Sequence, residues 1–164
     1  MSKKDSTAIL MSIDTAQAQG AVDGAREAAG ATRVLVVFEQ GRAGAAALRE
    51  AAELAVSGAE LHVVTLAPQA RPSRCCGPGP GPYNCAVREG AEEELHDARE
   101  NLGSTAQRAT FTTLVGCPDP PLAAWAAEHA FDLILLPAHR LTRGGNRLAN
   151  SLRRATAADV RLVR

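Results

Sequence analysis

The sequence predicts an α/β fold in which an open parallel sheet of five strands is flanked by helices, and two patterns support it. From residue 33 onward, short apolar runs rich in β-branched residues alternate with longer amphipathic segments rich in alanine. The short runs are apolar throughout, as is typical of strands covered on both faces. The length of 164 residues suits one domain with a sizeable core.

The first units along the chain follow this pattern. Residues 34–38 predict a buried strand, and residues 42–57 predict a helix with one apolar face that ends at Gly58. Residues 61–66 predict a second buried strand. The stretch 68–82 is rich in proline and glycine, so it is expected to form a long loop.

The later units repeat the alternation. Asn84 is expected to cap a helix that runs to about Asn101, with Gly103 as its stop. The remaining elements are expected at 109–115 (strand), 122–129 (helix), 133–136 (strand), 147–157 (helix) and 160–163 (strand).

The first 32 residues are treated as a separate segment from the domain at 33–164. Residues 8–13 read as a short strand and residues 15–29 as a helix weakened by Gly20 and Gly24. Two interpretations carry equal weight: an extra strand–helix unit, or a loosely packed arm.

Composition excludes several classes of function. The 18 basic residues balance the 18 acidic ones, whereas a general nucleic-acid-binding protein carries a basic excess. Aromatic residues make up only 3%, too few to stack the bases of a single strand. No apolar run reaches the ~18 residues of a membrane-spanning helix. We therefore expect a cytoplasmic protein that binds neither nucleic acid nor membranes.

Three stretches carry a resemblance to a known family: RVLVVFEQG, LHVVTLAP and TFTTLVGCPDPPLAAWAAEHAFDLILLPAHR. In order and spacing, residues 33–164 resemble the universal stress proteins. The resemblance implies a Rossmann-like sheet of the adenine nucleotide alpha hydrolase type, with strand order 3-2-1-4-5. It also implies a homodimer joined through the last strand, residues 160–163. Some members of this family bind ATP and others do not.

The resemblance also implies where a nucleotide would bind. The members that bind ATP carry an acidic residue after the first strand and a Gly-x2-Gly-x9-Gly-Ser/Thr loop after the fourth, whose backbone N–H groups hold phosphates. Here Glu39 fills the acidic position, but Pro137, Arg140 and Asn150 stand where the three glycines are expected. Only Ser151 is retained, so the loop is degenerate.

Charge is distributed unevenly along the chain. The stretch 132–164 has seven arginines against two aspartates, while the predicted helix at 88–100 has a net charge of −4. Arg140 and Arg143, beside Gly144 and Gly145, could hold an anionic ligand at a helix start. A solvated basic face is the alternative interpretation, and it is favoured because charge runs on helices usually face water.

The four cysteines offer a further hypothesis. Cys75, Cys76, Cys85 and Cys117 are all predicted near the carboxyl edge of the sheet, where α/β folds place ligands. Their spacing is not that of a zinc site, and buried cysteines commonly serve as small apolar residues. A redox or metal cluster is therefore a minority interpretation.

Three functions are carried forward. The first is a non-enzymatic, homodimeric stress-response module that binds ATP weakly or not at all, because no catalytic constellation is present. The second is a protein that binds ATP, AMP or another phosphate compound through Glu39, Arg140, Arg143 and Ser151, with Val64 lining the base pocket by resemblance. The third is a cysteine-based redox or metal sensor.

Overall fold

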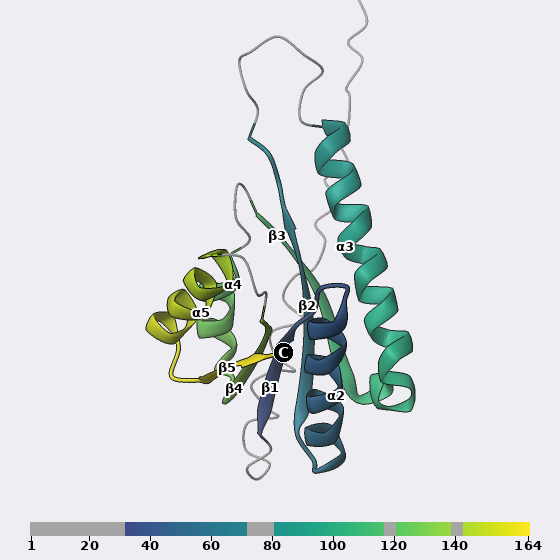
Figure 1. Ribbon diagram of the computed structural model, residues 1–164, viewed down its shortest axis with the longest axis vertical. Coiled ribbons are helices and arrows are strands. Elements are labelled where there is room, and N and C mark those ends of the chain that lie inside the picture. Colours follow the sequence, from purple (N-terminus) through teal and green to yellow (C-terminus); the bar gives the residue numbers. More distant parts are fainter. Residues whose placement is uncertain (1–31, 72–80, 117–120, 139–142) are drawn as a thin grey trace, which may run out of the picture. The chain divides into compact units, whose positions relative to one another are not determined.

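The computed structural model describes residues 32–71, 81–116, 121–138 and 143–164, all of which belong to the second of two units, Met1–Gly30 and Ala31–Arg164. In this part of the chain a single sheet of five parallel strands has the order β3-β2-β1-β4-β5, which confirms the predicted topology (Figure 1). The strands are β1 (Arg33–Val37), β2 (Glu60–Pro68), β3 (Ala109–Gly116), β4 (Leu133–Pro137) and β5 (Asp159–Val163).

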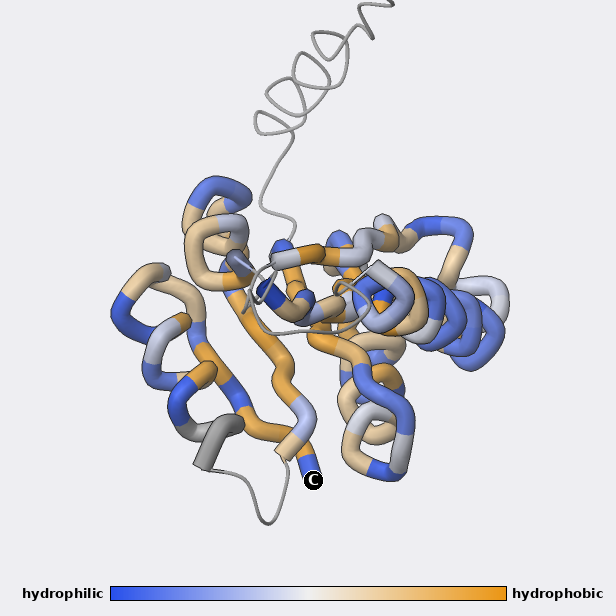
Figure 2. Tube along the Cα trace, turned by 90° about the horizontal axis from the view of Figure 1, so that it is seen from above, coloured by the Kyte–Doolittle hydropathy of each residue, from blue (hydrophilic) through white to orange (hydrophobic). Residues whose placement is uncertain are grey.

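Helices cover both faces of the sheet. The core on one face joins β1 and β2 to α2 and α3, and the core on the other joins β1 and β4 to α4 and α5. Seen from above, apolar strands run between the two helical layers (Figure 2). The helices are α2 (Arg42–Val56), α3 (Gly81–Leu102), α4 (Leu122–His129) and α5 (Arg143–Ala155). No helix in the described ranges is long and apolar enough to cross a membrane.

Successive side chains of β1 point to opposite faces of the sheet, so its continuous apolar run is buried only if helices cover both faces. Val34 and Val36 belong to the core beneath α2 and α3, whereas Leu35 and Val37 belong to the core beneath α4 and α5. All four side chains are at most 1% exposed. A strand buried in this way on both faces has no polar position, which is why its sequence lacks alternation.

Several predicted boundaries are wrong by a few residues. β2 continues to Pro68, which as the last residue of the strand breaks no interior ladder bond, so the predicted loop begins later. α3 begins at Gly81, so Asn84 lies inside the helix, where its side chain bonds both backbone groups of Ala70. A short 3₁₀ helix (Gly103–Arg108) that the sequence did not predict joins α3 to β3.

The amino end of the sheet is closed by a group of rings. Phe131 is 5% exposed, and the His62 ring meets it edge-on at a centroid distance of 5.1 Å. Trp125 stacks on His129 at 4.2 Å, and both residues are half-buried. The Arg33 guanidinium lies over Phe131 and donates a hydrogen bond to the His129 carbonyl oxygen.

Candidate functional site at the carboxyl end of the sheet

The connections after β1 and β4 form a crevice of the kind in which open α/β sheets bind ligands. β1 pairs with both β2 and β4. From β1 the chain passes to α2 on one face, whereas from β4 it passes to α5 on the other. Neighbouring strands whose connections diverge in this way leave a crevice at their carboxyl ends.

The turn after β1 is tight and holds Glu39 at this crevice. The Phe38 N–H bonds the Val64 carbonyl oxygen at 2.8 Å, which extends the pairing with β2 by one residue. Gly41 begins α2 with a φ of 122°, which only glycine adopts readily. A Cβ atom on Gly44 would overlap the Glu39 carbonyl oxygen, so this helix packs directly against the turn.

Carboxylates from α3 gather beside the same turn. The Gln40 N–H bonds Glu94 Oε1 at 3.4 Å, and the Gln40 side-chain amide bonds Asp97 Oδ2 at 2.6 Å. Burial raises the pKa of Glu94, and the charges of Glu39 and Asp97 raise it further, while the Gln40 N–H acts against them. The carboxyl end of β1 is therefore a region of negative potential.

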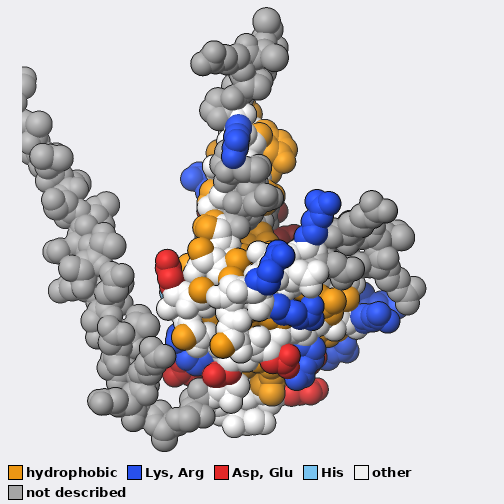
Figure 3. Space-filling view, turned by 90° about the vertical axis from the view of Figure 1, so that its left-hand side faces the viewer, with side chains coloured by type: hydrophobic (Ala, Val, Ile, Leu, Met, Phe, Trp, Pro, Cys, Tyr) orange, Lys and Arg blue, Asp and Glu red, His pale blue; other side chains and the backbone are white. Residues whose placement is uncertain are grey.

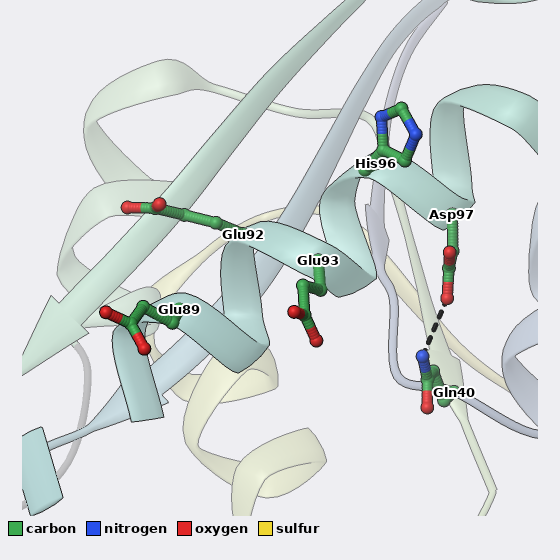
Figure 4. A pocket seen from close by; sticks show the side chains of 6 residues that line it. All are labelled: Gln40, Glu89, Glu92, Glu93, His96 and Asp97. Carbon is green, nitrogen blue, oxygen red and sulfur yellow. Dashed lines mark hydrogen bonds between the residues drawn. The ribbon is translucent and has the colours of Figure 1, made fainter. Parts of the chain in front are cut away.

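An open cleft of about 540 Å³ lies over this region (Figure 4). Five of its six lining residues come from α3, and the sixth, Gln40, reaches toward Asp97 from the β1–α2 turn. The cleft is lined by Gln40, Glu89, Glu92, Glu93, His96 and Asp97. Such a surface disfavours phosphate groups.

The other wall of the crevice differs from the sequence-based expectation. β4 ends at the buried Pro137, and α5 begins at Arg143 rather than at about residue 147. Gly144 and Gly145 therefore belong to the first turn of α5. Arg140 lies outside the described residues, and for Arg143 only the backbone is described.

This early helix start separates Asn150 and Ser151 from the crevice. They lie seven and eight residues beyond Arg143, which places them about 10–12 Å along the helix axis from its start. Asn150 is exposed and accepts a hydrogen bond of 3.4 Å from Arg153, and Ser151 is half-buried. The structure thus brings Glu39 and the buried Val64 close to one turn, whereas Asn150 and Ser151 lie inside a helix.

Of the four cysteines, only Cys85 falls within the described residues. It is exposed on α3, and its Sγ lies 3.5 Å from Glu89 Oε1. Cys75, Cys76 and Cys117 lie outside the described residues. In the part of the chain that the structure describes, no three histidine, cysteine or acidic side chains are grouped to hold a metal ion.

Sequence reasoning missed Gln40, Gly44, Glu94 and Asp97. Gly44 left a signal, since it interrupts an alanine-rich helix in which alanine would have been more favourable. The other three left none, because the bonds between the turn and α3 join residues more than 50 positions apart.

Residues 30–160 match the model of the universal stress protein family. The chain belongs to this family. The match confirms the resemblance carried by the three quoted stretches, and the observed strand order is the one that the resemblance implied. No curated protein sequence matches the chain.

Solved structures of low identity share the fold. A universal stress family protein from Burkholderia pseudomallei is 22% identical and has a TM-score of 0.58, with 80% of this chain and 95% of that chain covered. The Archaeoglobus fulgidus universal stress protein in complex with dAMP is 18% identical, with a TM-score of 0.55 and coverage of 82% and 98%. A universal stress protein in complex with cAMP is 21% identical, with a TM-score of 0.54 and the same coverage.

Proposed function

We propose that this chain is a non-enzymatic universal stress protein, acting in stress response or regulation, that binds ATP weakly or not at all. The observation that carries the proposal is the start of α5 at Arg143. Inside an α-helix, each N–H is bonded to the carbonyl four residues earlier, so the N–H groups of Asn150 and Ser151 are not available to phosphates. Pro137 has no N–H to offer.

Calorimetric titration with ATP and Mg²⁺ tests this proposal. We expect no saturable heat up to about 1 mM ATP, which corresponds to a binding free energy weaker than about −4 kcal/mol. Adenosine serves as the matched ligand without phosphates. A micromolar dissociation constant for ATP, together with weaker binding of adenosine, would contradict the proposal, because the phosphates would then contribute affinity.

A second candidate function is the binding of an adenosine monophosphate. It is favoured by the ligands of two neighbours in fold, cAMP and dAMP, each of which carries one phosphate. In this proposal Val64 lines the base pocket and Glu39 accepts hydrogen bonds from the ribose or the base. Arg140 and Arg143 hold the single phosphate.

Thermal unfolding with AMP, cAMP and ADP tests the second candidate. A ligand present at 100 times its dissociation constant stabilises the folded state by about 2.7 kcal/mol. We expect Glu39→Gln to reduce the rise in Tm with AMP, and Glu93→Gln, in the neighbouring cleft, to leave it unchanged. An equal loss in both variants would show that Glu39 has no specific role.

We also propose that the chain forms a homodimer through β5. The support is the position of β5 at the end of the described sheet, where a two-fold axis could join two edges into one continuous sheet. Sedimentation at micromolar to millimolar concentration tests it. A monomer throughout that range would contradict the proposal.

A further inference from the structure

The outer face of α5 carries a basic stripe formed by Arg147 and Arg154. The two residues lie seven positions apart, which places them on the same side of the helix and about 10 Å apart along its axis. Ala149 and Leu152 are buried against the sheet on the other side of the helix, so both arginines face the solvent. Arginine side chains gather on the face of the molecule that carries α4 and α5 (Figure 3).

Neither arginine of the basic stripe has an acidic partner in the part of the chain that the structure describes. By contrast, Arg33, Arg88 and Arg161 each lie within 3.8 Å of a carboxylate oxygen. A guanidinium group is weakly hydrated, and its planar fork matches the geometry of a carboxylate. The basic stripe is therefore available to bind acidic side chains of another molecule.

The matching acidic stripe lies on α3 and is formed by Glu93 and Glu100. They are exposed and also seven positions apart, while Leu95 and Ala98 on the other side of the helix are buried. Glu93 lines the open cleft and projects from α3 near its acidic neighbours (Figure 4). Glu100 lies 3.3 Å from the exposed ring of His96. The two stripes thus have opposite charge and the same spacing along their helices.

The two stripes of one molecule cannot meet each other. α3 packs on one face of the sheet through Leu95 and Ala98, whereas α5 packs on the opposite face through Ala149 and Leu152 (Figure 1). The chain has 18 basic and 18 acidic residues, so two copies do not repel each other through their net charge. A second copy of this chain is therefore the partner that the charge complementarity favours.

We propose that the acidic stripe of α3 docks onto the basic stripe of α5 in a second copy. Glu93 and Glu100 of one molecule then pair with Arg147 and Arg154 of the next, and the equal spacing allows both ion pairs to form at once. Each molecule uses a different surface toward each of its two neighbours, so the contact can continue from copy to copy. β5 takes no part in this contact, so it is independent of the proposed homodimer. Exposed ion pairs are individually weak and are screened by salt, so the association is transient and strongest at low ionic strength.

Sedimentation at two ionic strengths tests the association. At a protein concentration of about 1 mM, the wild-type protein is expected to form larger species in about 20 mM NaCl than in about 500 mM NaCl, where the screening length is about 4 Å. The double variant Glu93→Arg, Glu100→Arg makes both stripes basic. We expect its association in low salt to be about tenfold weaker than that of the wild type, because attraction is replaced by repulsion.

Two quadruple variants separate docking between the stripes from an effect of net charge. Adding Arg147→Glu and Arg154→Glu to the double variant reverses both stripes and restores the net charge, so the association is expected to return. Adding Arg42→Glu and Arg108→Glu instead, at exposed positions away from the stripes, restores the net charge but leaves both stripes basic. The association of this matched control is expected to stay weak.

Three results would overturn the docking of α3 on α5. The first is a wild-type protein whose species are the same size at both ionic strengths. The second is a return of the association in both quadruple variants, because net charge alone would then govern it. The third is no return in either of them. The proposed homodimer is expected in all four proteins and at both ionic strengths, since none of the substitutions lies in β5.

Discussion

At the amino end of the sheet Phe131 is enclosed by rings, whereas at the carboxyl end Glu94 is surrounded by other carboxylates. The first arrangement combines apolar burial with stacking and a cation over a ring. The second accumulates like charge around a half-buried acid, which costs stability. The difference indicates that the amino end stabilises the fold, while the carboxyl end retains unfavourable groups at the edge where α/β proteins bind ligands.

The largest expected effect concerns the rings of the amino end. Phe131→Ala should lower the free energy of unfolding by about 3–5 kcal/mol, because it removes a buried ring and leaves a cavity. Denaturant unfolding measures the change. Phe111→Ala, on the half-buried edge strand β3, is the control and should cost less. A loss for Phe131→Ala no larger than that for Phe111→Ala would contradict the stabilising role of the ring cluster at the amino end.

The next effect concerns backbone packing at the carboxyl end. Gly44→Ala should destabilise the protein by about 1–3 kcal/mol, because its Cβ atom would overlap the Glu39 carbonyl oxygen. Gly90→Ala is the matched control, since a Cβ atom there meets nothing within 4 Å. That change should instead stabilise α3 by about 0.5–1 kcal/mol. Stabilisation by both substitutions would contradict the tight turn.

The elements that leave a local signal could be predicted from the sequence alone. The apolar run of β1, the alanine face of α2 and the positive φ of Gly103 after α3 all agree with the predicted pattern. The strand order came from the family resemblance. Local signals suffice for these elements because the length and the apolar pattern of each run favour only one type of secondary structure.

The start of α5 could not be predicted from the same signals. Gly144 and Gly145 disfavour a helix locally, so the sequence suggested a loop that continues to residue 147. Burial of Ala149 and Leu152 on the sheet outweighs that preference. The error mattered for the site, because the predicted helix at 147–157 places Asn150 and Ser151 near its start, where backbone N–H groups can hold phosphate, whereas in the structure they lie well inside α5.

A third effect concerns the loss of folding stability at low pH, which His62 at the amino end is expected to cause. Burial, with the charges of Arg33 and His129, lowers the pKa of His62 to about 4 from 6.5. Between these values the unfolded chain binds the proton more readily, so stability is complete above pH 6.5 and is lost as the pH falls toward 4. His62→Gln should reduce this loss by about 1–2 kcal/mol, after allowing for solvent screening of a half-exposed ring.

Denaturant unfolding at several pH values measures the response, with His96→Gln as the exposed control. An unchanged pH dependence in His62→Gln would show that His62 does not carry the acid sensitivity.

The smallest expected effect is a gain in stability instead of a loss, and it concerns Glu94 at the carboxyl end of the sheet. Because the pKa of Glu94 is raised in the folded protein, the unfolded chain ionises first, and the cost of the charge is complete only above the folded pKa. Glu94→Gln should therefore stabilise the protein at pH 7, and the gain should vanish as the pH falls to about 4.5. We expect less than about 1 kcal/mol, because water screens a half-buried charge.

Glu92→Gln, an exposed change on the same helix, is the matched control. The glutamine side chain introduced by Glu94→Gln would still accept the bond from the Gln40 N–H through its amide oxygen, so the comparison isolates the charge. If Glu94→Gln is destabilising at pH 7, the carboxylate contributes a favourable interaction with Gln40 that exceeds its repulsion from Glu39 and Asp97. The carboxyl end would then be consolidated by its polar contacts, as the amino end is by its rings.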